Sequence, residues 1–317
     1  MDIAQLKTLV SVAELGSLSK AADSLMIAQP ALSRQMRLLE TELGVQLFTR
    51  HGRGMVLTEQ GREVLKHATR ILGEMDEIRA CASDADRPLS GQVAIGLPPT
   101  VADIISVPLA TAFREAHPGA VLRLVSAYTG YLLDWLHRGE IDLAVLYDPR
   151  SARSLKSEPL LLENLFLIGP RGARLSPIRA RQFRALAGER LLLPSVRHGL
   201  RAIVERCARE AGIALDVAVE ADSFATLKDL VAAGHGYTIL PLAPIHKEVE
   251  ARILTAAPLI DPAPVRRLVL SLPADRPISR LARFAGGEIK RIVGERVESG
   301  IWVGQLLDRD ERSHNGT

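Results

Sequence analysis

Residues 29–37, QPALSRQMR, place apolar and polar side chains on opposite sides of a helix. The apolar side carries Leu32 and Met36, and Pro30 stands in the first turn, where its missing N–H costs nothing. The opposite side carries four polar residues, Gln29, Ser33, Arg34 and Arg37. Glutamine pairs with adenine and arginine with guanine through two hydrogen bonds, and proline offers an apolar contact to a thymine methyl group. The segment therefore predicts a helix that reads DNA bases.

The neighbouring segments complete a DNA-binding unit. One helix is predicted over residues 3–15, ended by Gly16, and a second follows shortly after it. Two short apolar runs around a glycine-rich turn at residues 51–54 predict a β-hairpin. Three helices and a hairpin are typical of a winged helix-turn-helix, whose second motif helix enters the major groove. We expect the hairpin residues Arg50 and Arg53 to contact phosphate or the minor groove.

A long helix is predicted after the hairpin. Thr58 caps it, and its apolar residues recur in steps of three and four as far as about Ala82, close to a heptad pattern. A polar linker, residues 83–88, follows. The apolar stripe must be buried, either within the protomer or against a second copy. We favour a dimerisation helix, because a helix that bridges two domains has few other partners. Its seam residues are Leu65, Ala68, Leu72 and Met75.

The pattern changes near residue 90, where short apolar strands begin to alternate with helices. The first block has strands at 92–97, 121–125 and 141–146 and helices at 100–115 and 131–138. The second has strands at 190–193, 217–220 and 237–240 and helices at 200–211 and 223–233. A strand at 265–272 and a helix at 279–297 follow, before a polar tail from residue 308 that we expect to be disordered. The alternation predicts α/β subdomains with parallel sheets.

Composition limits the function classes. The 317 residues carry 40 Lys and Arg against 37 Asp and Glu, so a nucleic-acid partner must be bound by local patches. No apolar stretch approaches the ~18–20 residues of a membrane helix, and no signal sequence is visible. We therefore expect a soluble, cytoplasmic protein with no membrane partner. Cys81 and Cys207 lie far apart, which excludes a disulfide scaffold and a cysteine-based metal site.

Residues 1–86 resemble the DNA-binding domain and linker helix of LysR-type transcriptional regulators. The resemblance rests on Gly16-Ser17-Leu18, Ala21-Ala22, Gln29-Pro30-Ala31-Leu32-Ser33, Leu38-Leu39-Glu40, Leu43-Gly44, Leu47-Phe48-Thr49-Arg50, Leu57-Thr58 and Gly61. Ala28 departs from the family, which commonly has Ser or Thr there as a helix cap or phosphate contact. The α/β part is similar to the family's effector-binding domain. Residues 299–304 are faintly similar to the C-terminus of the nitrogen-assimilation-control regulators of this family.

The resemblance implies an all-α winged helix-turn-helix with a long linker helix, followed by a two-lobed α/β domain like a periplasmic binding protein. The expected DNA-binding domain is 1–58, the linker and dimerisation helix 59–88, and the effector-binding domain 89–317. Lobe I comprises 89–162 plus 267–300 and lobe II 163–266, with crossovers near 161–163 and 264–267. The family mechanism implies a homodimer or homotetramer on an inverted-repeat operator in double-stranded DNA. Effector binding would shift the lobes and, in an activator, change contact with RNA polymerase.

The effector site is expected where helices begin beyond the carboxyl ends of strands, because helix N-termini offer free N–H groups. A small anion such as a carboxylate suits these loops. Arg197 would grip it with a guanidinium fork, and His198 would be a pH-sensitive contact. Thr100 and Thr129 would supply hydroxyls and helix caps. The expected effector residues are Pro99, Thr100, Ser126, Thr129, Ser195, Arg197 and His198.

Two alternatives stay open. One is a catalytic or small-molecule-binding α/β domain fused to a DNA-binding module. The sequence has no G-x-S-x-G, H-E-x-x-H or P-loop motif, and His198 and His235 lack metal-ligand spacing, so no catalytic residue, metal or cofactor is assigned. Peroxide-sensing members of the family use a cysteine pair in the second lobe, where Cys207 has no partner. The other alternative is an effector-independent, nitrogen-assimilation-type regulator whose cleft is a remnant.

Overall fold

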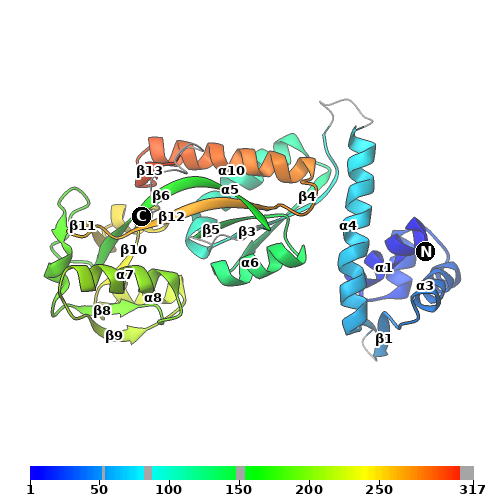
Figure 1. Ribbon diagram of the computed structural model, residues 1–317, viewed down its shortest axis with the longest axis horizontal. Coiled ribbons are helices and arrows are strands. Elements are labelled where there is room, and N and C mark those ends of the chain that lie inside the picture. The colour runs from blue at the N-terminus through cyan, green and yellow to red at the C-terminus, as the bar shows by residue number, and fades with distance from the viewer. Residues whose placement is uncertain (52–53, 82–87, 148–153, 308–317) are drawn as a thin grey trace. The chain divides into compact units, whose positions relative to one another are not determined.

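The computed structural model describes residues 1–51, 54–81, 88–147 and 154–307, and the chain divides after Gly91 into two units. The N-terminal unit has the predicted winged helix-turn-helix and long helix (Figure 1). Its elements are α1 (Ile3–Leu15), α2 (Leu18–Ser24), α3 (Gln29–Leu43), β1 (Phe48–His51), β2 (Gly54–Leu57) and α4 (Glu59–Cys81).

Caps fix where these helices begin and end. The Asp2 carboxylate accepts from the backbone N–H of Gln5 at 2.8 Å, and the Gln5 side chain accepts from the Asp2 N–H at 2.9 Å. Gly16, at φ 61°, ends α1 in the left-handed region that glycine adopts without strain. Helix α3 begins after Ala28 with no side-chain cap, as expected from the departure at that position.

The core of the N-terminal unit includes one residue assigned above to the dimer seam. Ala68 of α4 is completely buried together with residues of α1 and α3, and Leu65 and Leu72 are half-buried against the same cluster. Because Ala68 has no surface left for a partner to cover, it is a core residue, and its assignment to the seam is corrected. Among the α4 side chains that the structure describes, the exposed large apolar residues are Ile71, at 42%, and Ile78, at 70%.

The C-terminal unit has two lobes, each with its own hydrophobic core (Figure 1). Lobe I contains β3 (Gly91–Leu97), α5 (Pro99–Ala116), β4 (Ala120–Ser126), α6 (Thr129–Arg138), β5 (Leu143–Tyr147) and α10 (Arg280–Glu298). Lobe II contains β7 (Arg181–Gln182), β8 (Arg190–Leu193), α7 (Gly199–Glu210), β9 (Asp216–Glu220), α8 (Phe224–Ala232), β10 (Thr238–Pro241), α9 (His246–Glu250) and β11 (Leu254–Ile260). The short 3-10 helices η1 (Phe183–Leu186) and η2 (Ala243–Ile245) also lie in lobe II.

The sheets are mixed, which corrects the prediction of parallel sheets. Strand β3 pairs with β5, and β8 with β9, in parallel, as the alternation of strands and helices predicts. Strand β12 (Val265–Pro273) instead runs antiparallel to β5 and β6, and β6 (Leu155–Pro170) antiparallel to β10 and β11. The antiparallel pairs arise because β6 and β12 carry the chain from one lobe to the other and back (Figure 1).

The crossover between the lobes is a pair of long strands. Residues 155–164 of β6 pair with β12, whereas residues 165–170 pair with β10 and β11 of lobe II. We call residues 161–165 of β6 and 264–267 around the start of β12 the hinge. After α10 the chain returns to the hinge, where β13 (Gly304–Leu306) pairs antiparallel with residues 161–163 of β6.

Candidate functional site: a cleft between the lobes

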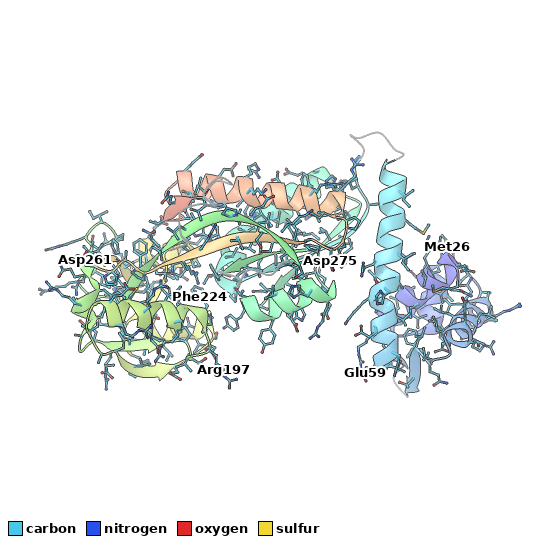
Figure 2. The ribbon with its side chains drawn as sticks, viewed as in Figure 1. Met26, Glu59, Arg197, Phe224, Asp261 and Asp275 are labelled. Carbon is cyan, nitrogen blue, oxygen red and sulfur yellow. The ribbon has the colours of Figure 1, made fainter. Side chains whose placement is uncertain are left out.

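A cleft of about 940 Å³ lies between the two lobes of the C-terminal unit. Residues from the first turns of α5, α6, α7 and α8 all line it. The wall on lobe I consists of Pro98, Pro99, Thr100, Tyr128, Thr129, Gly130, Tyr131, Asp134 and Tyr147. The remainder consists of Pro194, Ser195, Arg197, His198, Gly199, Leu200, Ile203, Asp222, Phe224, Leu227, Leu240 and the hinge residue Arg266. Figure 2 labels Arg197 and Phe224 on lobe II.

Six of the seven predicted effector residues line this cleft. They are Pro99, Thr100, Thr129, Ser195, Arg197 and His198. Ser126 does not, because it is the exposed last residue of β4 and the loop reaches the cleft only two residues later. Tyr128 occupies that part of the wall instead.

The two threonines do not cap helices, which corrects the role predicted for them. The N-cap residues of α5 and α6 are Pro98 and Tyr128, and neither makes a side-chain cap. The Thr100 hydroxyl lies 2.8 Å from the Tyr147 hydroxyl, and Thr129 Oγ1 accepts from the Tyr147 backbone N–H at 3.2 Å. Both threonines therefore hold Tyr147 in the floor of the cleft, and no side-chain cap hydrogen bond is made at the N-termini of α5 and α6.

A buried cluster at the hinge contains residues that sequence reasoning missed. Arg266 is 5% exposed and forms an ion pair through Nε with Glu163, which is 1% exposed. Its Nη2 donates to Thr100 Oγ1 at 3.2 Å, and its guanidinium carbon lies 3.7 Å from the centre of the Tyr147 ring. Arg266 thus brings a buried positive charge to the cleft. The sequence signal that could have revealed this cluster is the pair of opposite charges, Glu163 and Arg266. Each lies beside an apolar run at one of the two expected crossovers.

His198 caps α7, and the charges of Arg266 and Asp222 both act on its ring. Its Nδ1 accepts from the Leu200 backbone N–H at 3.1 Å, so a neutral ring carries its proton on Nε2. Burial lowers the pKa of His198, and the positive charge of Arg266 lowers it further. In the floor, burial raises the pKa of Tyr147, which stays a neutral hydrogen-bonding group. At neutral pH His198 and Tyr147 are therefore uncharged hydrogen-bonding groups near the guanidinium of Arg266.

Tyr128 reaches across the cleft from lobe I. Its hydroxyl donates to the backbone carbonyl of Asp222 in lobe II, and its ring meets the His198 ring edge to face at 5.0 Å. Burial raises the pKa of the Tyr128 hydroxyl, with a further rise from the Asp222 carboxylate, so the donor keeps its proton. The two contacts hold the lobes together at one point of the cleft.

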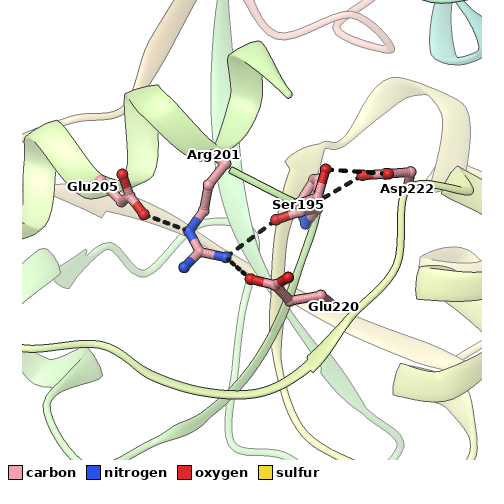
Figure 3. A network of polar contacts seen from close by, with 6 residues as sticks. Ser195, Arg201, Glu205, Glu220 and Asp222 are labelled. Atoms are coloured by element: carbon pink, nitrogen blue, oxygen red, sulfur yellow. Dashed lines mark hydrogen bonds and ion pairs between the residues drawn. The ribbon is translucent and has the colours of Figure 1, made fainter. Parts of the chain in front are cut away.

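The lobe II wall is fixed by a polar network (Figure 3). Arg201 of α7 donates to Glu205 at 2.8 Å, to Glu220 at 3.1 Å and to the Pro194 carbonyl at 3.1 Å. In the adjacent part of Figure 3, Ser195 donates to the Asp222 carboxylate from its N–H at 2.9 Å and from its hydroxyl at 3.1 Å. These bonds from Ser195 lower the pKa of Asp222. The network sets the position of the loop that carries Arg197 and His198.

The predicted DNA-reading side chains lie on the surface of α3. Gln29, Pro30, Arg34 and Arg37 are exposed and Ser33 is half-buried, whereas Leu32 and Met36 are buried. Neither arginine forms an ion pair within the part of the chain that the structure describes. Arg53 and the side chain of Arg50 lie outside the described residues.

The remaining candidate chemistry is limited. Cys207 is buried in the core of lobe II, and burial raises the pKa of its thiol. His235 lies in a turn between Gly234 and Gly236, both at positive φ. Within the described ranges there is no cluster of three or more His, Cys, Asp or Glu residues that could hold a metal ion. No helix in those ranges is long and apolar enough to cross a membrane.

Comparison with known proteins gives two family matches that cover most of the chain. Residues 3–62 match the family described as bacterial regulatory helix-turn-helix protein, lysR family, and residues 86–286 match the LysR substrate binding domain. The nitrogen assimilation regulatory protein nac of Klebsiella aerogenes is 36% identical over 242 residues, which is 76% of this chain and 78% of that protein. The DNA-binding transcriptional dual regulator OxyR of Escherichia coli K12 is 32% identical over 85% of this chain and 88% of its own length.

A solved structure agrees with the fold. The Corynebacterium glutamicum OxyR C206 mutant superposes with a TM-score of 0.70 at 29% identity, covering 96% of this chain and 97% of that one. Both the winged helix-turn-helix and the two-lobed α/β unit are therefore shared with a protein of known structure.

Proposed function

The chain belongs to the LysR family of bacterial transcriptional regulators, and we propose that its interlobe cleft binds a small anionic effector that controls an operator-bound oligomer. Members of this family bind DNA, assemble as multimers and bind small-molecule effectors, and this chain has the DNA-binding and effector-binding domains of such a regulator. The proposal concerns the class of effector, the operator and the oligomer.

Four helix N-termini that line one cleft carry the proposal of an anion. Each N-terminus brings a partial positive charge and N–H groups without helical partners. The charged lining side chains balance, with Arg197 and Arg266 against Asp134 and Asp222. The partial positive charges of the helix N-termini therefore favour a negative ligand. The guanidinium of Arg266 can bind a carboxylate through two hydrogen bonds.

A thermal-shift screen of the full chain tests this proposal. The panel comprises benzoate, glutamate, acetate, sulfate and phosphate, and a compound that binds the folded state raises the unfolding temperature. We expect the shift to vanish in Arg197→Ala and to persist in Arg209→Ala, which removes the same charge from the outer surface of α7. A shift that survives Arg197→Ala would place the anion elsewhere.

For DNA, we propose that α3 lies in the major groove, with base contacts from Gln29, Pro30, Ser33, Arg34 and Arg37 and wing contacts from Arg50 and Arg53. Two copies would pair through the part of α4 that the protomer leaves open. Ile71, Met75 and Ile78 follow each other at steps of four and three, as in a heptad seam, and Ile71 and Ile78 are exposed. Such a dimer places two recognition helices on an inverted repeat. An activator would contact RNA polymerase in the cytoplasm.

A second candidate is a regulator that needs no effector, so that its abundance is the signal. One observation favours it: the charge of Arg266 is already matched by Glu163 without a ligand. This candidate predicts no shift from any panel compound while operator binding stays intact.

Relatives named as hydrogen peroxide-inducible activators do not lead us to propose peroxide sensing. Disulfide formation within the α/β unit needs two cysteines, and the sequence places only Cys207 there. Its raised thiol pKa also opposes the thiolate that reacts with peroxide. An enzymatic role is not proposed either, because the relatives are transcriptional regulators. The lowered pKa of Asp222, which accepts from the Ser195 hydroxyl, also makes that carboxylate a weak base.

A further inference from the structure

The C-terminal end of the described chain lies across the hinge. We call residues 301–306 the C-terminal strap. A Cβ atom on Gly304 would lie 2.4 Å from the carbonyl oxygen of Leu162, so the strap rests directly on β6. The strap follows α10, which packs on α5 of lobe I, and its residue Val303 packs against the lobe II core. It therefore contacts both lobes at the point where the chain passes between them.

Trp302 is the residue by which the strap reaches the hinge cluster. It is 1% exposed and is the largest of the fully buried side chains in the described ranges. Its indole N–H donates to Glu163 Oε1 at 2.6 Å, while the other oxygen of the same carboxylate accepts from Arg266 Nε. Each carboxylate oxygen thus has one buried donor, and together the two donors fix the plane of the Glu163 carboxylate.

The same series of contacts ends in the cleft. Glu163 orients the Arg266 guanidinium, whose Nη2 donates to Thr100 and whose face lies on the Tyr147 ring. Arg266, Thr100 and Tyr147 line the cleft, whereas Trp302 and Glu163 do not. Trp302 can therefore influence a ligand only through Glu163 and Arg266.

We propose that Trp302 is a positioning residue for the effector site, which holds Arg266 in its ligand-binding orientation through Glu163. The inference rests on the proposed function of the cleft. A buried ion pair is stable only when its remaining hydrogen bonds are satisfied, and loss of the indole donor leaves Glu163 Oε1 buried without a partner. The carboxylate then rotates or draws in water, and the Arg266 guanidinium loses its fixed direction. The strap is thereby a determinant of effector affinity.

The first test needs no ligand. Phenylglyoxal modifies arginine side chains, and mass spectrometry of the peptide that contains residue 266 gives the rate at that position. We expect Trp302→Phe to speed modification of Arg266 several-fold, because phenylalanine keeps most of the packing and removes only the donor. The control is Phe183→Leu, which loosens the lobe II core at a fully buried residue outside the hinge cluster and the cleft. An unchanged rate at Arg266 in folded Trp302→Phe overturns the inference.

The second test uses benzoate and sulfate as probes. We expect Trp302→Phe to weaken binding of whichever probe binds the wild type by about tenfold, the equivalent of one hydrogen bond to a charged group. Phe183→Leu should leave the affinity unchanged. In Trp135→Phe, Trp302 is the remaining tryptophan of the two in the sequence, and its fluorescence should change when the probe binds. This measurement needs no substitution at residue 302.

The outcomes separate the inference from the proposal on which it rests. Faster labelling of Arg266 with no probe bound by the wild type supports the positioning role and contradicts the anionic effector. A probe that binds wild type and Trp302→Phe equally, with unchanged labelling, overturns the inference and leaves the effector site standing.

Discussion

Arg266 Nη2 donates a hydrogen bond to Thr100 Oγ1 at 3.2 Å, so a residue of the hinge is joined to the first turn of a lobe I helix. Thr100 and Arg266 are 166 positions apart in sequence. A ligand that bound Arg266 would compete with or add to this bond, and it would do so at the hinge, where the chain passes from one lobe to the other. The contact therefore links occupancy of the cleft to the geometry of the lobes.

The base-reading role of α3 makes a specific prediction. Arg34→Ala should cost about 1–3 kcal/mol of operator affinity and relax preference at one base position, because a bidentate contact to guanine is lost. Arg70→Ala, which removes an exposed arginine from α4, serves as the control. Selection of bound sequences from a random pool measures the preference. An equal loss on all sequences would make Arg34 a phosphate contact instead.

The wing should contribute to affinity without sequence preference. Arg53→Ala should weaken binding to every duplex and reduce the slope of log affinity against log salt by about 1, because one phosphate contact is lost. Filter binding at several salt concentrations gives the slope. An unchanged slope removes Arg53 from the DNA contacts.

The division of α4 between core and dimer seam predicts two different phenotypes. Met75→Glu and Ile78→Glu should split the oligomer and leave the protomer folded, since Ile78 is 70% exposed in the protomer. Ala68→Glu should instead unfold the N-terminal unit, because it buries a charge in the core. Light scattering measures the mass of the oligomer, and circular dichroism shows whether each variant is folded. An unchanged mass in both seam variants would refute the seam.

Arg201 should stabilise lobe II through its buried guanidinium. Arg201→Met removes donors to two carboxylates and to the Pro194 carbonyl and should lower the free energy of unfolding by about 1–3 kcal/mol. The matched control is Arg206→Met on the same helix, whose ion pair is exposed and 3.8 Å long, and it should change stability little. Urea denaturation compares the two. Equal effects would show that the network does not stabilise the loop.

The lowered pKa of His198 gives a pH dependence. Below its ordinary value of 6.5, the unfolded histidine binds a proton that the folded one resists. The unfolded state then holds more protons, so stability falls as pH drops from about 6.5 toward the folded pKa. His198→Asn keeps a capping side chain and should reduce this loss between pH 7.5 and 5.5. Melting temperatures across that range check it, and an identical pH dependence would exclude His198 as a source.

The sequence predicted the N-terminal unit well because its signals are local. Gly16, Pro30 and Thr58 each mark a helix boundary by their own chemistry, and the apolar spacing supplies the face of each helix. The same local reasoning failed at Ala68. The spacing of the apolar residues in α4 shows that they are buried, but not whether the core of the protomer or a second copy buries them.

The hinge was missed because its signals are not local. Strand β6 contains Pro159, Glu163 and Asn164 among apolar residues and lacks the alternation of a half-buried strand. Arg266 and Glu163 are 103 positions apart in sequence, and they form an ion pair only because β12 and β6 lie side by side. Helix N-termini, in contrast, can be placed from sequence. For that reason six of the predicted effector residues line the cleft, whereas Arg266, which also lines it, was not predicted.

Calorimetric titration of the panel anions into wild type and Thr100→Val tests the central claim most directly. Valine keeps the shape of threonine and removes the hydroxyl that links Arg266 to Tyr147. The account predicts that at least one anion binds the wild type and binds Thr100→Val about tenfold more weakly. Equal binding to both proteins, or no binding by a wild type that still binds its operator, would contradict an anionic effector in this cleft.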